Sequence, residues 1–499
     1  MEDGSMCAAF KIVVINDNGL NESLPITEIS AVLKNSGFET DLLIQKDEGA
    51  RFFEEIAHIH PDAFVVPFDI MGQSWSINIT NELKKRWRDI PVIAVGTYAT
   101  LFPEVLSQCD ADVLCRGEAE YALKEFFTKL RNNEDYGGVK NLWIKRDGEI
   151  VKNQLRPLIS NLDELPIPDR ELYYRRYEYL RKFSTKRIVA GRGCAQRCFY
   201  CYNPALQDLY ECRGKLFTRK KSPERVLVDI EDLKKRAVVK SIYFIDDLFT
   251  DDKAWLLKFC EIYPRKFKIP FACNITADSV DEDKTKALKS AGCRAVLMGV
   301  ETGNEKLRVE VLNKVVKDEQ IVRAAELFKK YKMKFLTYNM LGLPTETLDS
   351  LLKTVEFNQK LRPDYIRVTV AFPMPHTKMT DIAVEKGLVT KEALEHIFSL
   401  PPKQQYTTSI YQSDAKFMKK VRRLYHLFPF AVKFNLPKWF VRFLINVPFL
   451  SPILKWVHYF TVLWEEKGVF NITLISGLRF FFHTGHPLNK TKNANNFVP

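Results

Sequence analysis

GCAQRCFYCY, residues 193–202, places three cysteines at a C-x3-C-x2-C spacing, with Tyr200 just before the last of them. The thiolates of Cys194, Cys198 and Cys201 could bind three irons of a 4Fe-4S cluster. Such clusters normally take four cysteines, so the fourth iron would be open to a small molecule. The other interpretations are a zinc site or three unrelated buried thiols. Structural zinc sites close with four N or S ligands, usually from paired C-x2-C units, and the sequence has no second unit.

Short apolar runs rich in β-forming residues alternate with helical stretches around this motif. One such stretch is Pro223–Arg236, which follows Ser222 as an N-cap. Alternating strands and helices predict parallel pairing and right-handed crossovers. Chemistry in α/β barrels lies at the carboxyl ends of strands, and Cys194 follows the first run directly. The predicted strands are 187–191, 241–245, 270–274, 295–300, 335–340 and 365–370.

The cysteine motif and the six β/α units resemble the radical S-adenosylmethionine (radical SAM) family. That resemblance implies a partial (β/α)6 barrel whose open cluster iron binds SAM, and an electron that splits SAM to a 5'-deoxyadenosyl radical. Residues 299–304, GVETGN, resemble the family's G-x-E-S-G turn. Residues 341–347, LGLPTET, resemble its G-L-P-G-E-T turn, with Thr345 in place of glycine.

The resemblance also implies which side chains bind the cofactors. A helix cap or a solvated loop is the alternative interpretation of each carboxylate among them. The residues implied to lie near SAM are Tyr200, Asp246, Gly299, Glu301 and Gly303.

The first part of the chain predicts a separate, open, doubly wound sheet, which binds ligands beyond the carboxyl ends of its strands. Its predicted strands are 11–15, 41–44, 63–67, 91–95 and 112–115.

Two segments after these strands, residues 96–104 (GTYATLFPE) and 116–120 (RGEAE), resemble loops of Rossmann-like cobalamin-binding domains fused to radical SAM barrels. The resemblance implies that Gly96, Tyr98 and Thr100 lie near the corrin. Tyr98 stands where histidine is common, and no D-x-H-x-x-G motif is present, so cobalt would lack a histidine from that motif. A degenerate domain kept for architecture is the alternative.

We therefore predict four parts: a Rossmann-like cobalamin-binding domain at 10–150, a linker at 151–183, a radical SAM barrel at 184–385, and a helical, basic and aromatic region at 386–499. The resemblance covers roughly residues 10–385, including the linker segment LDELPIP at 162–168.

Composition agrees with a large intracellular enzyme. The chain has 499 residues, 46% of them apolar, which is enough for two cores. Its ten cysteines show no disulfide-like framework, and we expect a reducing, cytoplasmic location without a signal peptide. A second cluster is the less favoured reading of four further cysteines, which we expect to be buried thiols: Cys212, Cys260, Cys273 and Cys293.

The C-terminal region holds most of the excess positive charge. From Ala415 onward there are thirteen Lys or Arg and two Glu, and 18 of the chain's 61 aromatic residues. Basic and aromatic amphipathic segments are typical of the headgroup zone of an anionic bilayer. The longest uncharged stretch, 443–454, has only twelve residues, whereas a span needs about twenty. We expect peripheral contact at the inner face of the membrane, with a cap over the barrel mouth as the alternative and no nucleic acid.

These patterns predict a radical SAM enzyme with cobalamin as a further cofactor. By resemblance, the commonest reaction is methylation of an unactivated carbon, in which one SAM supplies the methyl group through cobalamin and a second yields the radical. We expect a small-molecule or lipid-like substrate, and flavodoxin or ferredoxin as electron donor. The alternatives are oxidative cyclisation or rearrangement without methyl transfer, and a non-catalytic membrane-associated scaffold, which the intact cysteine triad disfavours.

Overall fold

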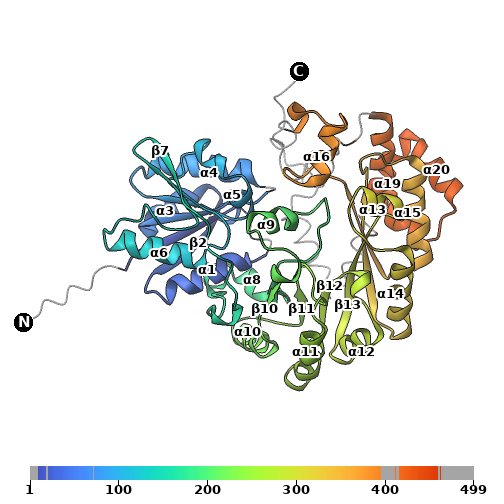
Figure 1. The fold of residues 1–499 in the computed structure, drawn as a ribbon, viewed down its shortest axis with the longest axis horizontal. Coiled ribbons are helices and arrows are strands. Elements are labelled where there is room, and N and C mark those ends of the chain that lie inside the picture. Colours follow the sequence, from blue (N-terminus) through green and yellow to red (C-terminus); the bar gives the residue numbers. More distant parts are fainter. Residues whose placement is uncertain are drawn as a thin grey trace, which may run out of the picture.

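The structure is a computed structural model that describes residues 9–17, 19, 21–70, 72–394, 411, 415–458 and 461. Figure 1 shows two α/β units side by side, the first in blue and cyan and the second in green and yellow, with α9 between them. Helices α19 and α20 lie at the outer edge of the second unit.

The first unit is built on a seven-stranded sheet with the order β2-β1-β3-β4-β5-β6-β7. Strands β1 to β5 are parallel, as expected for a doubly wound sheet, and β6 and β7 extend it as an antiparallel hairpin. Every residue of β3 and β4 is buried, because helices cover both faces of a parallel sheet. The strands are β1 (Lys11–Asn16), β2 (Glu39–Ile44), β3 (Ala63–Pro67), β4 (Val92–Val95), β5 (Val113–Cys115), β6 (Leu142–Arg146) and β7 (Glu149–Lys152). The helices are α1 (Leu24–Lys34), α2 (Gln45–Glu48), α3 (Phe52–Ile59), α4 (Gln73–Arg86), α5 (Thr97–Leu101) and α6 (Glu120–Arg131).

The connector between the two sheets is packed against both units. It contains α7 (Glu171–Tyr174) and α8 (Glu178–Lys182). Asp169 accepts a hydrogen bond from Ser30 Oγ at 2.6 Å, and the buried Arg170 pairs with Glu22 at 3.2 Å. Arg170 also donates to the Arg187 carbonyl of β8 at 2.7 Å, so the connector fixes one unit against the other.

The second unit has a six-stranded, wholly parallel sheet with the order β15-β14-β13-β12-β11-β8, which confirms the predicted half-barrel. Its strands are β8 (Thr185–Ile188), β11 (Ser241–Phe244), β12 (Phe271–Ile275), β13 (Cys293–Glu301), β14 (Lys334–Leu341) and β15 (Tyr365–Val370). Its helices are α9 (Asn203–Leu209), α10 (Pro223–Arg236), α11 (Lys253–Lys266), α12 (Glu282–Ser290), α13 (Glu305–Glu310), α14 (Asp318–Lys330), α15 (Leu348–Leu361) and α16 (Lys378–Glu385).

The first barrel strand ends earlier than predicted, at Ile188 instead of Gly191. The chain leaves the sheet there, and β9 (Gly191–Arg192) pairs with β10 (Arg219–Lys220) in a separate antiparallel ribbon. Cys194 therefore follows the ribbon and not the barrel strand itself.

The C-terminal helices flank the barrel. Helix α19 (Ala415–Lys433) packs on β15 and α15, and α20 (Lys438–Asn446) packs on α19 and α15. Among the described residues, no single helix has the length and hydropathy needed to cross a membrane. The segments Lys438–Asn446 and Pro448–His458 meet the test only when taken together, and they are bent by 89°.

Candidate functional site

The cysteine motif forms the loop between β9 and α9. Cys194 and Cys198 are buried and Cys201 is half-buried. Burial raises the pKa of Cys194 to about 12 and that of Cys201 to about 11, and each of the two is also raised by the charge of Cys198 nearby. Among the described residues no group of three or more His, Cys, Asp or Glu side chains could hold a single metal ion. Iron binds the thiolates, so loading a cluster into this loop releases protons.

The cysteine loop is held by hydrogen bonds from three directions. Gln207 Nε2 donates to the Cys194 carbonyl at 2.8 Å. The Phe199 amide donates to the Leu312 carbonyl at 2.9 Å, and the Phe199 carbonyl accepts from the Met379 amide at 2.9 Å. The three thiols are therefore positioned by the fold of the surrounding chain.

Tyr200 and Glu301, both predicted near SAM, lie together. Tyr200 Oη donates to Glu301 Oε1 at 3.0 Å, and Lys314 Nζ donates to the same oxygen at 2.8 Å. Glu301 adopts φ +64°, which turns its side chain back towards the cysteine loop. The carboxylate thus links the end of β13 to the loop that carries the thiols.

The two glycines of this turn differ in what a side chain would meet. A Cβ at Gly299 would displace the ends of the Glu301 and Lys314 side chains, whereas a Cβ at Gly303 would lie 2.6 Å from the Lys353 carbonyl oxygen of α15, so packing requires glycine at Gly303. Their predicted contact with SAM stays a prediction. Thr345, which stands where the family has glycine, adopts φ +62°, so the turn keeps the left-handed conformation despite its β-branched residue.

The two aspartates after β11 have different surroundings. Asp246 is buried, and its Oδ2 accepts a hydrogen bond from the Ala190 amide at 3.0 Å. Asp247 lies beside the thiols, since its charge raises the pKa of both Cys194 and Cys201. The sequence interpretation placed Asp246 near SAM, and that stays a prediction. In the structure Asp246 also fixes the start of the cysteine loop, and Asp247 interacts electrostatically with two of the thiols.

Asp246→Asn is expected to change the pH dependence of stability. Burial raises the pKa of Asp246 to about 6 from an ordinary value of 3.8. The folded protein therefore binds more protons than the unfolded chain between these values, so the wild type loses about 3 kcal/mol of stability as the pH rises through this window. In urea unfolding, the free energy of unfolding of the variant should rise relative to that of the wild type from about pH 4 to about pH 7. A difference that does not vary with pH would contradict the assignment.

The predicted cobalamin residues gather at the carboxyl edge of the first sheet. Gly96 has φ +112°, and a Cβ there would lie 2.9 Å from the Phe68 carbonyl oxygen. Thr100 Oγ1 donates to the Gly96 carbonyl at 2.8 Å and accepts from the Gly117 amide at 2.9 Å. The loops that follow β4 and β5 are thereby joined.

Tyr98 lies where the two units meet. Its ring stacks on Phe102 with centroids 4.5 Å apart, and Phe102 contacts His376, which follows β15, at 4.6 Å. Tyr202, directly after Cys201, is close enough to Tyr98 that the two phenols interact electrostatically. Tyr202 Oη is buried and has no hydrogen-bond partner among the described residues. A polar ligand between the two loops would supply one.

A buried ionic cluster joins the two units beside the cysteine loop. Arg192, two residues before Cys194, donates to Glu118 at 2.8 Å, to Glu28 at 2.6 Å and to Glu120 at 2.5 Å. Burial alone would raise the pKa of Glu28, but Arg192 and Lys221 lower it to about 2.

The turn between β5 and α6, which carries Glu118, also contacts the chain that follows the cysteine loop. Tyr210 Oη, just after α9, accepts from the Glu118 amide at 3.2 Å. A Cβ at Gly117 would lie 1.7 Å from that oxygen, so the position requires glycine. The cysteine loop is therefore fastened at both ends to the turn between β5 and α6.

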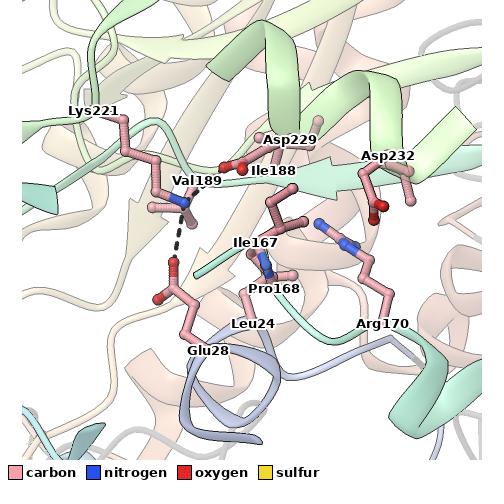
Figure 2. Close-up of a pocket in the computed structure, with 11 residues that line it drawn as sticks. Leu24, Glu28, Ile167, Pro168, Arg170, Ile188, Val189, Lys221, Asp229 and Asp232 are labelled. Carbon is pink, nitrogen blue, oxygen red and sulfur yellow. Dashed lines mark hydrogen bonds and ion pairs between the residues drawn. The ribbon is translucent and has the colours of Figure 1, made fainter. Parts of the chain in front are cut away.

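The hollow beneath this cluster is small. Figure 2 shows Lys221 Nζ between Glu28, at 3.1 Å, and Asp229, at 2.9 Å. The space is about 20 Å³, enough for roughly one water molecule. It is a gap between packed elements and cannot hold a substrate.

The inner face of the barrel carries a polar belt just below its rim. Arg187 and Tyr243 are register partners on β8 and β11, and Tyr338 and Arg367 are partners on β14 and β15. Tyr243 Oη donates to Asn274 Oδ1 at 2.8 Å. These polar groups could meet a substrate above the small apolar layer of Ala272, Ala295 and Leu297.

Sequence analysis missed the belt, the ionic cluster and Tyr202. The alternation along β15 could have indicated the belt, because Arg367 interrupts an apolar run, whereas Arg187 follows the polar residues 184–186 and carries no such signal. Tyr202 could have been found from its position next to Cys201. Arg192 carries no local signal, since its three carboxylate partners lie 72 or more residues away.

Comparisons with known proteins agree with this geometry. Residues 188–357 match the family model of the radical SAM superfamily. The chain is 27% identical over 341 residues to an uncharacterised methyltransferase of Pyrococcus horikoshii, which covers 68% of this chain and 72% of that protein. It is 25% identical over 303 residues to an anaerobic magnesium-protoporphyrin IX monomethyl ester cyclase of Rubrivivax gelatinosus, covering 58% of this chain and 53% of the cyclase.

A solved structure of the cobalamin-dependent SAM radical enzyme OxsB with aqua-cobalamin superposes with a TM-score of 0.68 at 15% identity, over 96% of this chain and 76% of that one. This likeness extends the agreement in fold from the barrel to the first sheet. Residues 188–357 are therefore similar to the radical SAM superfamily, and the chain as a whole has the two-unit fold of the solved OxsB structure.

Proposed function

We propose that this protein uses a 4Fe-4S cluster, SAM and cobalamin to methylate an unactivated carbon of a hydrophobic or membrane-associated substrate. The observation that carries the proposal is the meeting of the two units. Tyr98 from the first sheet and Tyr202 from the cysteine loop face the same junction, and Arg192 and Tyr210 fasten that loop to the turn after β5.

The donor set fits an iron-sulfur cluster with one open iron. Three thiols lie on one loop, and Asp247 after β11 and Glu301 at the end of β13, strands separated by β12, both reach that loop. The junction at Tyr98 fits a flat ligand, because it is lined by the stacked rings of Tyr98 and Phe102 and by the loop at Gly96, where the backbone has no side chain. When bound, the cluster supplies the electron that cleaves SAM, and cobalamin supplies the methyl group.

In this reaction the side chains of the protein would bind the cluster and orient SAM and the substrate. Cys194, Cys198 and Cys201 would hold the irons, and Glu301, fixed by Tyr200 and Lys314, would position a ligand hydroxyl or amine at the rim. Asp247 would attract the ammonium group of SAM. Arg187 and Tyr243 on the inner face would hold a polar group of the substrate.

The relatives support methyl transfer and also name one alternative. The Pyrococcus horikoshii relative is named a methyltransferase, and the OxsB structure contains cobalamin. The Rubrivivax gelatinosus relative is named a cyclase, so oxidative cyclisation is the second candidate. Anaerobic turnover with SAM labelled in its methyl group, a flavodoxin or ferredoxin as reductant, and extracted membrane lipids separates them. Label in the product supports methylation, and an unlabelled oxidised product supports cyclisation.

Gly96→Ala is expected to weaken cobalamin binding about tenfold, which corresponds to 1.4 kcal/mol. The added Cβ would meet the Phe68 carbonyl oxygen at 2.9 Å, and φ +112° disfavours any side chain, so the loop that carries Tyr98 would shift. Titration of the anaerobic protein with hydroxocobalamin, followed by corrin absorbance, measures the affinity.

Gly138→Ala is the matched control, because a Cβ there has nothing within 4 Å. Its affinity should equal that of the wild type. If the wild type binds no cobalamin yet cleaves SAM, the first unit is architectural and the reaction is independent of cobalamin.

A further inference from the structure

The solvent-facing side of α20 is unusually apolar for a helix on a protein surface. Val441 and Ile445 are buried against the neighbouring helices, as expected for the inward face. The opposite side should be polar in a surface helix. It instead exposes Trp439 at 71% and Phe443 at 57%, one helical turn apart.

The next helical segment repeats this arrangement. Phe449, Ile453 and Trp456 follow one another at helical spacing and are exposed at 78%, 57% and 51%. Leu454, between them in the sequence, is buried. We call Trp439, Phe443, Phe449, Ile453 and Trp456 the outward apolar face.

Positive charge accompanies this face. Residues 415–458 contain nine Lys or Arg and no Asp or Glu. Arg442 and Lys455 lie between members of the outward apolar face and are themselves exposed. Two side chains of α20 contact carboxylates of α15, Lys438 with Glu356 at 3.2 Å and Arg442 with Asp349 at 3.8 Å, and α19 and α20 contribute no acidic group of their own.

We propose that the outward apolar face docks on the surface of an anionic lipid bilayer. Tryptophan and phenylalanine insert at the depth of the headgroups, and arginine and lysine beside them attract anionic lipid. The 89° bend between the two segments fits helices that lie along the surface. The surface is independent of the reaction, because none of its residues belongs to the cysteine loop or the junction at Tyr98.

Flotation of the full-length protein tests this proposal. Vesicles are made either of phosphatidylcholine alone or of equal parts phosphatidylcholine and phosphatidylglycerol, at low and at high salt. The protein should float with the anionic vesicles at low salt, and less at high salt because ions screen the attraction. Protein that stays at the bottom of the gradient with anionic vesicles at low salt overturns the proposal.

Two variants separate the contributions. Arg442→Gln with Lys455→Gln should lower the partition coefficient about 25-fold, since each basic residue near an anionic surface contributes about fivefold. Trp439→Ser with Phe443→Ser should lower it about tenfold or more, and this loss should persist in high salt. Both losses support bilayer docking, and unchanged partitioning of either variant overturns it.

Matched controls carry the same changes elsewhere on the surface. Val228→Ser with Leu257→Ser removes side chains exposed at 42% and 37% on α10 and α11. Lys235→Gln with Lys286→Gln removes two exposed charges of the barrel helices. Both controls should float like the wild type, and circular dichroism should be unchanged for every variant. No turnover is required, so failure of the proposed reaction leaves this test unaffected.

Discussion

Cys198→Ala is expected to abolish reductive cleavage of SAM, with a fall in rate of at least a thousandfold, or about 4 kcal/mol in the barrier. Cys198 lies between the other two thiols in the sequence and is buried on a loop fixed by the Phe199 hydrogen bonds. Its loss leaves two cysteine ligands, too few to retain a four-iron cluster with one open site. Iron analysis after anaerobic reconstitution and the EPR signal of the reduced protein, with and without SAM, measure the outcome.

Cys212→Ala is the matched control. Cys212 lies just after α9, is half-buried, and sits outside the triad. Its iron content and SAM cleavage should equal those of the wild type. Equal loss in the two variants would show that iron binding does not follow the C-x3-C-x2-C spacing.

Arg192→Gln is expected to destabilise the protein by about 3–5 kcal/mol, because removing one partner of a buried ion pair leaves uncompensated charge. Among the described residues Glu120 pairs with no cation but Arg192, whereas Glu28 would keep Lys221 and Glu118 would keep Arg219. Arg192→Lys should lose less, since it keeps the charge but replaces the rigid, planar fork that meets the three carboxylates with a compact ammonium group. Urea unfolding gives the free energies.

Arg86→Gln provides the comparison for that variant. Arg86 pairs with Glu82 on the exposed side of α4, where an ion pair contributes about 0–1 kcal/mol. The expected order of destabilisation is Arg192→Gln, then Arg192→Lys, then Arg86→Gln. If Arg192→Gln costs no more than Arg86→Gln, the cluster does not hold the units together.

The fold could be predicted from the sequence wherever local pattern and topology agree. Buried parallel strands are continuous apolar runs, and Ser222 marks the start of α10, so both were identified with nearly correct bounds. The end of β8 was misplaced because residues 189–191 are as apolar as a strand. The chain leaves the sheet where long-range bonds hold it, from the Ala190 amide to Asp246 and between Gly191 and Lys220 in the β9–β10 ribbon, and neither has a local signal.

The sequence was enough to predict the motifs of the site, but not which carboxylate oxygens face the thiols. Adjacent residues of a strand end point to different sides, so the sequence could not say whether Asp246 or Asp247 faces the thiols. The same limit applies to Glu301, whose positive φ redirects its side chain. Contacts across units, such as that of Phe102 with His376, depend on how two separately recognisable folds pack together.

The fastening of the cysteine loop to the turn between β5 and α6 also bears on how such chains recombine. Fused domains are often regarded as exchangeable cassettes. Here a transplanted first unit would have to bring Gly117, since any larger residue collides with Tyr210, together with carboxylates matching Glu28, Glu118 and Glu120. Exchange of either unit is therefore expected to preserve folding only when the incoming unit carries its own side of these contacts.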